Sequence, residues 1–148
     1  MSPSHRDPLL AEMRLALSAE FGALAMYSYL SRARKDPELS DLLSGFRAEE
    51  VEQIAKLRAL IERPGGRAPE RRRRRTIAAG VLYGITRIVG NGLALRLCLE
   101  SEETVSRWYA GFAVHLARAG SAEDARTCES LAVTKRRHAL ALQAWVER

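Results

Sequence analysis

Residues 10–27 decide the fold: Leu10-Ala-Glu-Met-Arg-Leu-Ala-Leu-Ser-Ala-Glu-Phe-Gly-Ala-Leu-Ala-Met-Tyr27. Apolar side chains recur in this stretch at spacings of three and four residues, which is the period of one face of an α-helix. One carboxylate, Glu20, interrupts that face near its middle. The pattern predicts a helix over about 8–34 with the inward stripe Leu10, Met13, Leu17, Glu20, Leu24 and Tyr27.

The same period recurs in three later stretches. Asp36-Pro37 precedes the first of them, Pro64-Gly65-Gly66 ends it, and Gly120 ends the next. Ser121 followed by Asp124 resembles a capping box, with Asp in the usual place of Glu, that opens the last helix. The three further helices are expected at about 38–62, 93–118 and 122–146.

The connections predict how these helices pack. Two of them are short and make their flanking helices antiparallel neighbours. The middle one consists of a basic linker, 63–75, and a glycine-spaced apolar crossover, 76–92. It is long enough to return along a helix of about 37 Å, at 1.5 Å per residue. We therefore expect one all-α domain over 1–148, a four-helix bundle with one long crossover between its second and third helices.

The net charge of +6 is confined to one segment. Seven arginines and a single acid lie between Arg63 and Arg75, so the rest of the chain is neutral. This distribution does not favour a uniformly basic nucleic-acid binder. The polar N-terminus lacks the apolar run of a secretory signal, and two cysteines, Cys98 and Cys128, fit a reducing compartment without disulfides. We expect a cytoplasmic protein.

Each of the four apolar stripes is interrupted by polar side chains at one level of the bundle. Buried carboxylates are costly unless a metal, a proton or a cationic side chain compensates them. The core must therefore carry its own counter-charge, and a lysine, a histidine or a bound cation could provide it. The interrupting residues are Glu20, Glu50, Gln53, Glu102, Lys135 and His138.

Plainer interpretations exist for each of these residues. A glutamate could belong to the helix surface if the register is shifted by one, as for Glu49, Glu52 or Glu103. Lysine can extend along its aliphatic stem to solvent, and a lone buried histidine can be a packing residue. Two tyrosines, Tyr27 and Tyr109, fit core positions whose hydroxyls reach a buried carboxylate, with a redox role as the alternative.

The motif Glu20-Phe-Gly-Ala-Leu-Ala-Met-Tyr27 is repeated as Glu102-Glu-Thr-Val-Ser-Arg-Trp-Tyr109. With the segments Phe46-Arg-Ala-Glu-Glu50-Val-Glu-Gln53 and Lys135-Arg-Arg-His138, it resembles the ferritin-like superfamily, within it the rubrerythrin-like and demethoxyubiquinone-hydroxylase-like di-iron carboxylate proteins. The resemblance covers about 9–145. It implies a ferritin-like bundle and a site where carboxylates and histidines from four helices hold two irons.

The resemblance assigns metal ligands residue by residue. The matched positions are Glu20, Glu50, Glu102 and His138. The departing positions are Gln53, where the family has histidine, and Lys135, where it has glutamate. An ammonium group removes a bridging carboxylate and adds positive charge where a metal would lie, so a normal di-iron centre is not expected.

Two functions follow as hypotheses. In the first, Lys135 replaces one metal and Glu50, Glu102 and His138 hold a single ion, iron being the expected metal, in an oxygen-dependent oxidoreductase or hydroxylase. In the second, the core is metal-free and the protein is a catalytically inactive binding or structural module. No catalytic residue is assigned, and one metal ion or none is expected rather than two.

The basic linker suggests partners. Arg71–Arg75 followed by the apolar crossover could lie on an anionic membrane surface, so a peripheral location on its inner face is one prediction. A solvated loop leading into a crossover packed on the bundle is the alternative. Arginines without aromatic platforms or a recognition helix do not favour specific nucleic-acid binding. A homo-oligomer is left open.

Overall fold

The computed structural model of the chain describes residues 3–32, 36–63 and 91–148. Its secondary structure there is helical, with no strand in the described part of the chain. The predicted all-α class is thereby confirmed. The helices are α1 (Pro3–Leu30), α2 (Pro37–Glu62), α4 (Asn91–Arg118) and α5 (Ala122–Val146).

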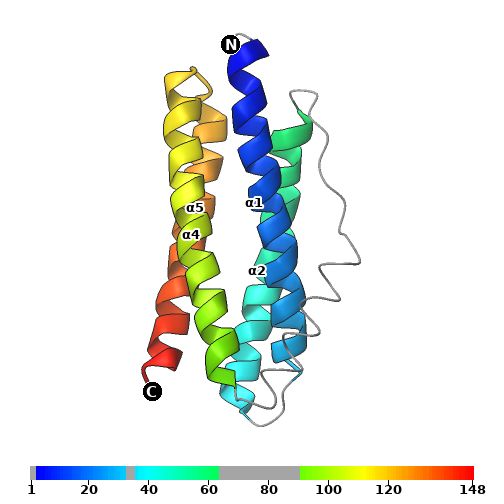
Figure 1. Cartoon of the computed structure of the whole chain (residues 1–148), viewed down its shortest axis with the longest axis vertical. Helices are drawn as coiled ribbons and strands as arrows, with labels where there is room; N and C mark the ends of the chain where they lie inside the picture. Colours follow the sequence, from blue (N-terminus) through cyan, green and yellow to red (C-terminus); the bar gives the residue numbers. More distant parts are fainter. Residues whose placement is uncertain (1–2, 33–35, 64–90) are drawn as a thin grey trace.

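The four helices form a bundle in which each helix packs against two others. The packed pairs are α1 with α2, α4 with α5, α1 with α4, and α2 with α5. Each packed pair is antiparallel, while α2 and α4, at diagonal corners, run in the same direction (Figure 1). The predicted basic linker and crossover fall on 63–92, most of which lies outside the described residues.

Three of the four predicted helices agree with the structure to within two residues at each end. The first helix and the helix caps differ from the sequence interpretation. The first helix begins at Pro3 and ends at Leu30, so Pro8 lies inside it rather than near its start. Asp36 caps α2, its side chain accepting a hydrogen bond from the amide of Leu39 at 3.2 Å. The capping box expected at Ser121 is wrong, because that side chain makes no cap hydrogen bond.

The core consists of two apolar clusters separated by a polar layer. One cluster joins the N-terminal half of α1 and the C-terminal half of α2 to the neighbouring halves of α4 and α5. The other joins the opposite halves of the same helices. The predicted stripe is shifted by one at Leu9, which is buried in place of Leu10.

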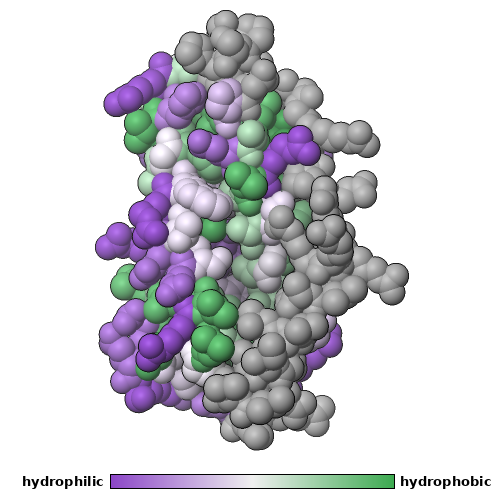
Figure 2. All heavy atoms as spheres, in the orientation of Figure 1, coloured by the Kyte–Doolittle hydropathy of each residue, from purple (hydrophilic) through white to green (hydrophobic). Residues whose placement is uncertain are grey.

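The surface of the bundle is mixed in character. One face shows hydrophilic side chains interspersed with apolar ones, without one continuous apolar band over the coloured atoms (Figure 2). Among the helices that the structure describes, none combines the length and the apolar character needed to cross a membrane.

Candidate metal centre

The polar layer predicted from the four stripes is present, and all six of its members are buried. Their exposed fractions run from 0% to 3%. The layer receives Glu20 from α1, Glu50 and Gln53 from α2, and the remaining three from α4 and α5. The plainer interpretations, in which these glutamates and Lys135 reach solvent, are therefore wrong. Four helices deliver charged or amide groups into one water-excluded layer.

Lys135 is the centre of this layer. Its Nζ lies 2.8 Å from Oε2 of Glu20 and 3.3 Å from Oε1 of Glu102, and it also donates a hydrogen bond to Oε1 of Glu50. These carboxylates come from α1, α4 and α2, so one ammonium group on α5 contacts all three other helices. Burial lowers the pKa of Lys135, but the three carboxylates outweigh it and the net shift is upward. The side chain is therefore a fixed cation.

His138 lies beside this ammonium and is oriented from outside the layer. Its Nε2 is 2.9 Å from Oε2 of Glu49, which also forms an ion pair with Arg137. Its ring stacks on Phe46, with centroids 4.0 Å apart and an interplanar angle of 23°. Because a carboxylate only accepts hydrogen bonds, Nε2 carries the proton that it shares with Glu49. In the neutral ring this leaves Nδ1 as a lone pair directed at the layer.

Nδ1 of His138 faces carboxylate oxygens of the layer. Nδ1 of His138 is 3.4 Å from Oε2 of Glu102 and 3.9 Å from Oε1 of Glu50. Among the residues that the structure describes, neither Nδ1 nor Oε2 of Glu102 nor Oε2 of Glu50 has a hydrogen-bond partner. One ligand atom from each of the three residues lies within 4.8 Å of the others. Buried acceptors that face one another need a proton or a cation between them.

The carboxylates titrate in opposite directions. Burial raises the pKa of Glu50 well above its usual range, and the neighbouring charges of Glu20 and Glu102 outweigh Lys135. Burial also raises the pKa of Glu102, but His138 and Lys135 outweigh it, so that the net shift is downward. Glu102 is thus the carboxylate held in its charged form, and Glu50 is the one that keeps a proton when no further cation compensates it.

The two tyrosines of the repeated motif differ in their bonding. The hydroxyl of Tyr27 donates a hydrogen bond to Oε1 of Glu102 at 2.6 Å, so it bonds across the bundle to the glutamate of the other repeat. The hydroxyl of Tyr109 is buried without a partner, as are both polar atoms of the Gln53 amide. The pKa of each tyrosine is raised by burial and nearby carboxylates, which keeps both phenols protonated.

The two cysteines are free and buried, in agreement with the prediction of no disulfide. Burial, followed by the charges of Glu102 and Glu50, raises the pKa of Cys98 to about 12. Burial and nearby carboxylates likewise raise the pKa of Cys128 to about 12. Neither is therefore a thiolate ligand at neutral pH.

The sequence interpretation missed Glu49, Arg137 and Phe46 as supports of His138. Glu49 had been considered only as a competitor of Glu50 for the inward register. Glu49 could have been identified from the sequence. A histidine that binds a metal needs a hydrogen-bond acceptor for its second ring nitrogen, and Glu49, next to the inward-facing Glu50, can provide one.

Comparisons of this chain with protein-family models, with curated proteins and with solved structures find no match. The fold and the geometry of the polar layer are the observations on which its function has to be argued.

Proposed function

We propose that this protein is a ferritin-like bundle, with a long crossover after α2, that binds a single metal ion through Glu50, Glu102 and His138. The observation that carries the proposal is the lone pair of His138 Nδ1 facing two carboxylates, with unpartnered atoms on all three residues. A divalent cation would satisfy all three at once. The hydrogen bond from Nε2 to Glu49 supports it, because metal-ligating histidines usually donate their other N–H to a carboxylate or carbonyl.

The charge balance supports one ion rather than two. Three buried carboxylates surround a single ammonium group, so negative charge remains in excess. Lys135 already contacts each carboxylate and takes the place of a second cation. In the metal-free core the raised pKa of Glu50 keeps its carboxyl group protonated, and metal binding would release this proton.

Iron is the ion that we propose. Two carboxylate oxygens and one imidazole form a mixed ligand set that suits ferrous iron, manganese or zinc. A ferrous ion bound here would supply one-electron chemistry toward oxygen, the oxidoreductase activity that the resemblance implies. The described residues would hold the ion, orient its imidazole through Glu49 and keep the layer dry, and Tyr27 would donate a hydrogen bond to the carboxylate of Glu102.

The test is the metal content of the purified protein. The protein is stripped with EDTA, loaded anaerobically with ferrous iron or with cobalt(II) as an optical probe, desalted and analysed for metal. We expect one ion per chain and cobalt absorption bands typical of oxygen and nitrogen ligands. The variant His138→Gln should lose at least tenfold in affinity, while His115→Gln, at an exposed position on α4, should bind normally. Two ions per chain would contradict the replacement by Lys135.

A metal-free core is the second candidate function, in which the bundle is a catalytically inactive binding or structural module. The contact of Lys135 with all three carboxylates favours it, because this ammonium already compensates much of their charge. In that case the proton that Glu50 keeps and the ammonium of Lys135 close the network in place of a metal ion. No retained metal, and a thermal midpoint that EDTA leaves unchanged, would select this candidate over the first.

A further inference from the structure

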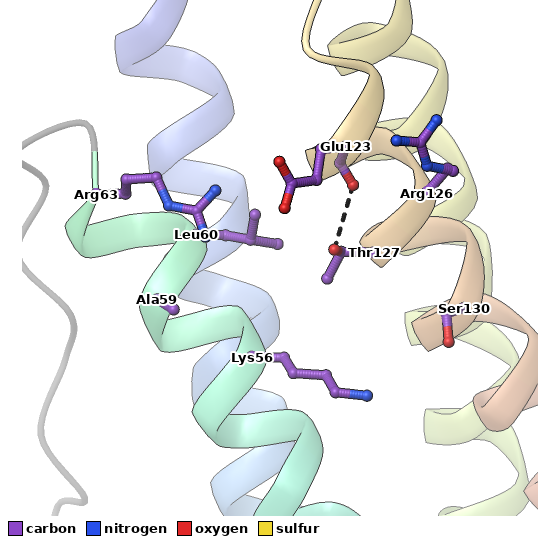
Figure 3. A pocket seen from close by; sticks show the side chains of 8 residues that line it. All are labelled: Lys56, Ala59, Leu60, Arg63, Glu123, Arg126, Thr127 and Ser130. Atoms are coloured by element: carbon purple, nitrogen blue, oxygen red, sulfur yellow. Dashed lines mark hydrogen bonds between the residues drawn. The ribbon is translucent and has the colours of Figure 1, made fainter.

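A hollow of about 410 Å³ lies outside the polar layer, between the last two turns of α2 and the first turns of α5. Figure 3 shows Lys56 and Arg63 extending from α2 toward α5, and Glu123 extending from α5 toward α2. Each wall is one stripe of a helix, because its lining residues recur at spacings of three and four. This volume falls in the range of small-molecule sites, roughly 300 to 1,000 Å³.

Basic side chains outnumber acidic ones in the lining of the hollow. Lys56, Arg63 and Arg126 line it, against the single carboxylate of Glu123. Arg63 forms an ion pair with Asp124 at 2.5 Å. Within the described part of the chain, Lys56 and Arg126 have no ion-pair or hydrogen-bond partner. Two unpaired cations on opposite walls of one hollow favour an anion placed between them.

The remaining lining suits an anion that has several oxygens and a small apolar part. The hydroxyls of Thr127 and Ser130 lie on the α5 wall, and the Thr127 hydroxyl donates to the backbone carbonyl of Glu123 at 3.3 Å. Leu60 adds an apolar surface on the α2 wall. Guanidinium groups match the geometry of phosphate oxygens, and a lysine adds a point charge.

We propose that this hollow, the α2–α5 groove, binds the phosphate group of a phosphomonoester, with Lys56 and Arg126 as its charged contacts and Ser130 as a hydrogen-bond donor. Soluble metabolites and lipid headgroups both carry such a phosphate, and the chemistry of recognition is the same. This inference is independent of the metal proposal, because the groove uses no residue of the polar layer.

The experiment separates the groove from the arginine-rich segment nearby in sequence. Inorganic phosphate and glycerol 3-phosphate are titrated into the isotope-labelled protein in EDTA, so that no metal can bind them. Amide chemical shifts are followed by NMR. We expect one site per chain, with shifts concentrated at 56–63 and 123–130. The double variant Lys56→Gln/Arg126→Gln should bind at least tenfold more weakly.

A matched control removes the same charge elsewhere. The double variant Arg73→Gln/Arg74→Gln should change the affinity less than threefold, and both variants are checked for unchanged helicity by circular dichroism. Binding to vesicles with phosphatidic acid, lost in the groove variant but without binding of the soluble phosphates, would assign the phosphate to a lipid. Equal loss in both variants, or no binding to the soluble phosphates and none to the vesicles, would overturn the proposal.

Discussion

The repeated motif places Glu20 and Tyr27 on α1 and Glu102 and Tyr109 on α4, yet the two copies differ in what they bond. Tyr27 donates to Glu102 across the bundle, whereas the Tyr109 hydroxyl has no partner. The difference extends to the paired helices. His138 on α5 is held by Glu49 and Phe46, while the amide of Gln53 on α2 has no partner.

The motif therefore determines where its glutamate and tyrosine lie, but not which groups they form hydrogen bonds with. Both copies bury a glutamate in the polar layer and a tyrosine in one of the two apolar clusters, because helical period places both residues on one face. What each pair does depends on the residues facing it. Imidazole and its support organise one side of the layer, and the other side lacks an equivalent. Variants that make the two sides alike, and measurements of how much they differ, test this interpretation.

The largest expected effect comes from making the two sides alike. The double variant Lys135→Glu/Gln53→His restores the two departing residues, and we expect two metal ions per chain in place of one. Elemental analysis after anaerobic loading with ferrous iron measures this. The single variant Gln53→His is the control and should still bind one ion, because the ammonium remains. One ion in the double variant would refute the alignment of these two positions.

Removing the ammonium alone should destabilise the core strongly. Lys135→Met leaves three buried carboxylates without their cation, a change that typically costs about 3–5 kcal/mol in the free energy of unfolding. Guanidinium unfolding in EDTA measures it, and added metal should recover part of the loss. Lys56→Met, on the surface, should stay within about 0.5 kcal/mol of the parent. A loss below about 1 kcal/mol at Lys135 would show that the charges are solvated.

The two carboxylates with opposite pKa shifts should give opposite pH dependences without metal. Glu50 has a raised pKa, so the folded state holds a proton that the unfolded chain loses above about 4.5, and stability falls as the pH rises. Glu102 has a lowered pKa, so its contribution is present above about 4.5 and is lost as the pH falls.

The matching variants separate these contributions. Glu102→Gln should lower the free energy of unfolding at neutral pH by about 1–3 kcal/mol, and Glu50→Gln should remove the decline toward higher pH at little or no cost. Unfolding curves in EDTA between about pH 4 and pH 8 measure both. The same pH profile for the two variants would contradict the difference between the carboxylates.

The smallest effects distinguish the tyrosines. Tyr27→Phe removes a hydrogen bond to a charged carboxylate and should cost about 1.5–3 kcal/mol. Tyr109→Phe removes a hydroxyl that has no partner and should be neutral within about 0.5 kcal/mol, or slightly stabilising. Thermal unfolding of the two variants side by side gives the answer. Equal losses would mean that Tyr109 bonds a buried water.

The sequence was sufficient for the all-α class, for the bounds of three helices and for all six members of the polar layer. Helical period determines a residue's face and level, and the cost of burying charge identifies the layer. It was not sufficient to predict which side chains contact one another within the layer. Lys135 contacts three carboxylates at once, and His138 bonds to Glu49. Both contacts depend on the rotation of each helix about its axis and on side-chain rotamers. A small change in either moves a side-chain atom by less than the distance between neighbouring stripe residues, so the sequence pattern does not determine them.

The helix ends were predicted less accurately for a related reason. The helix predicted to begin near Pro8 begins at Pro3, so Pro8 lies inside it, where a proline removes one backbone hydrogen bond. Ser121 has the residue type of a cap but makes no cap hydrogen bond. In both cases the residue type alone did not determine the structure of the helix end.

The ammonium of Lys135 has a consequence for how this protein is made. In a core whose charge is neutralised only by metal, a newly synthesised chain must wait for ions before its helices can close. Here the counter-charge is covalently part of the polypeptide and touches all three other helices. The bundle can therefore close without metal, and for the metal site that we propose, metal supply would govern its occupancy rather than the abundance of the folded protein.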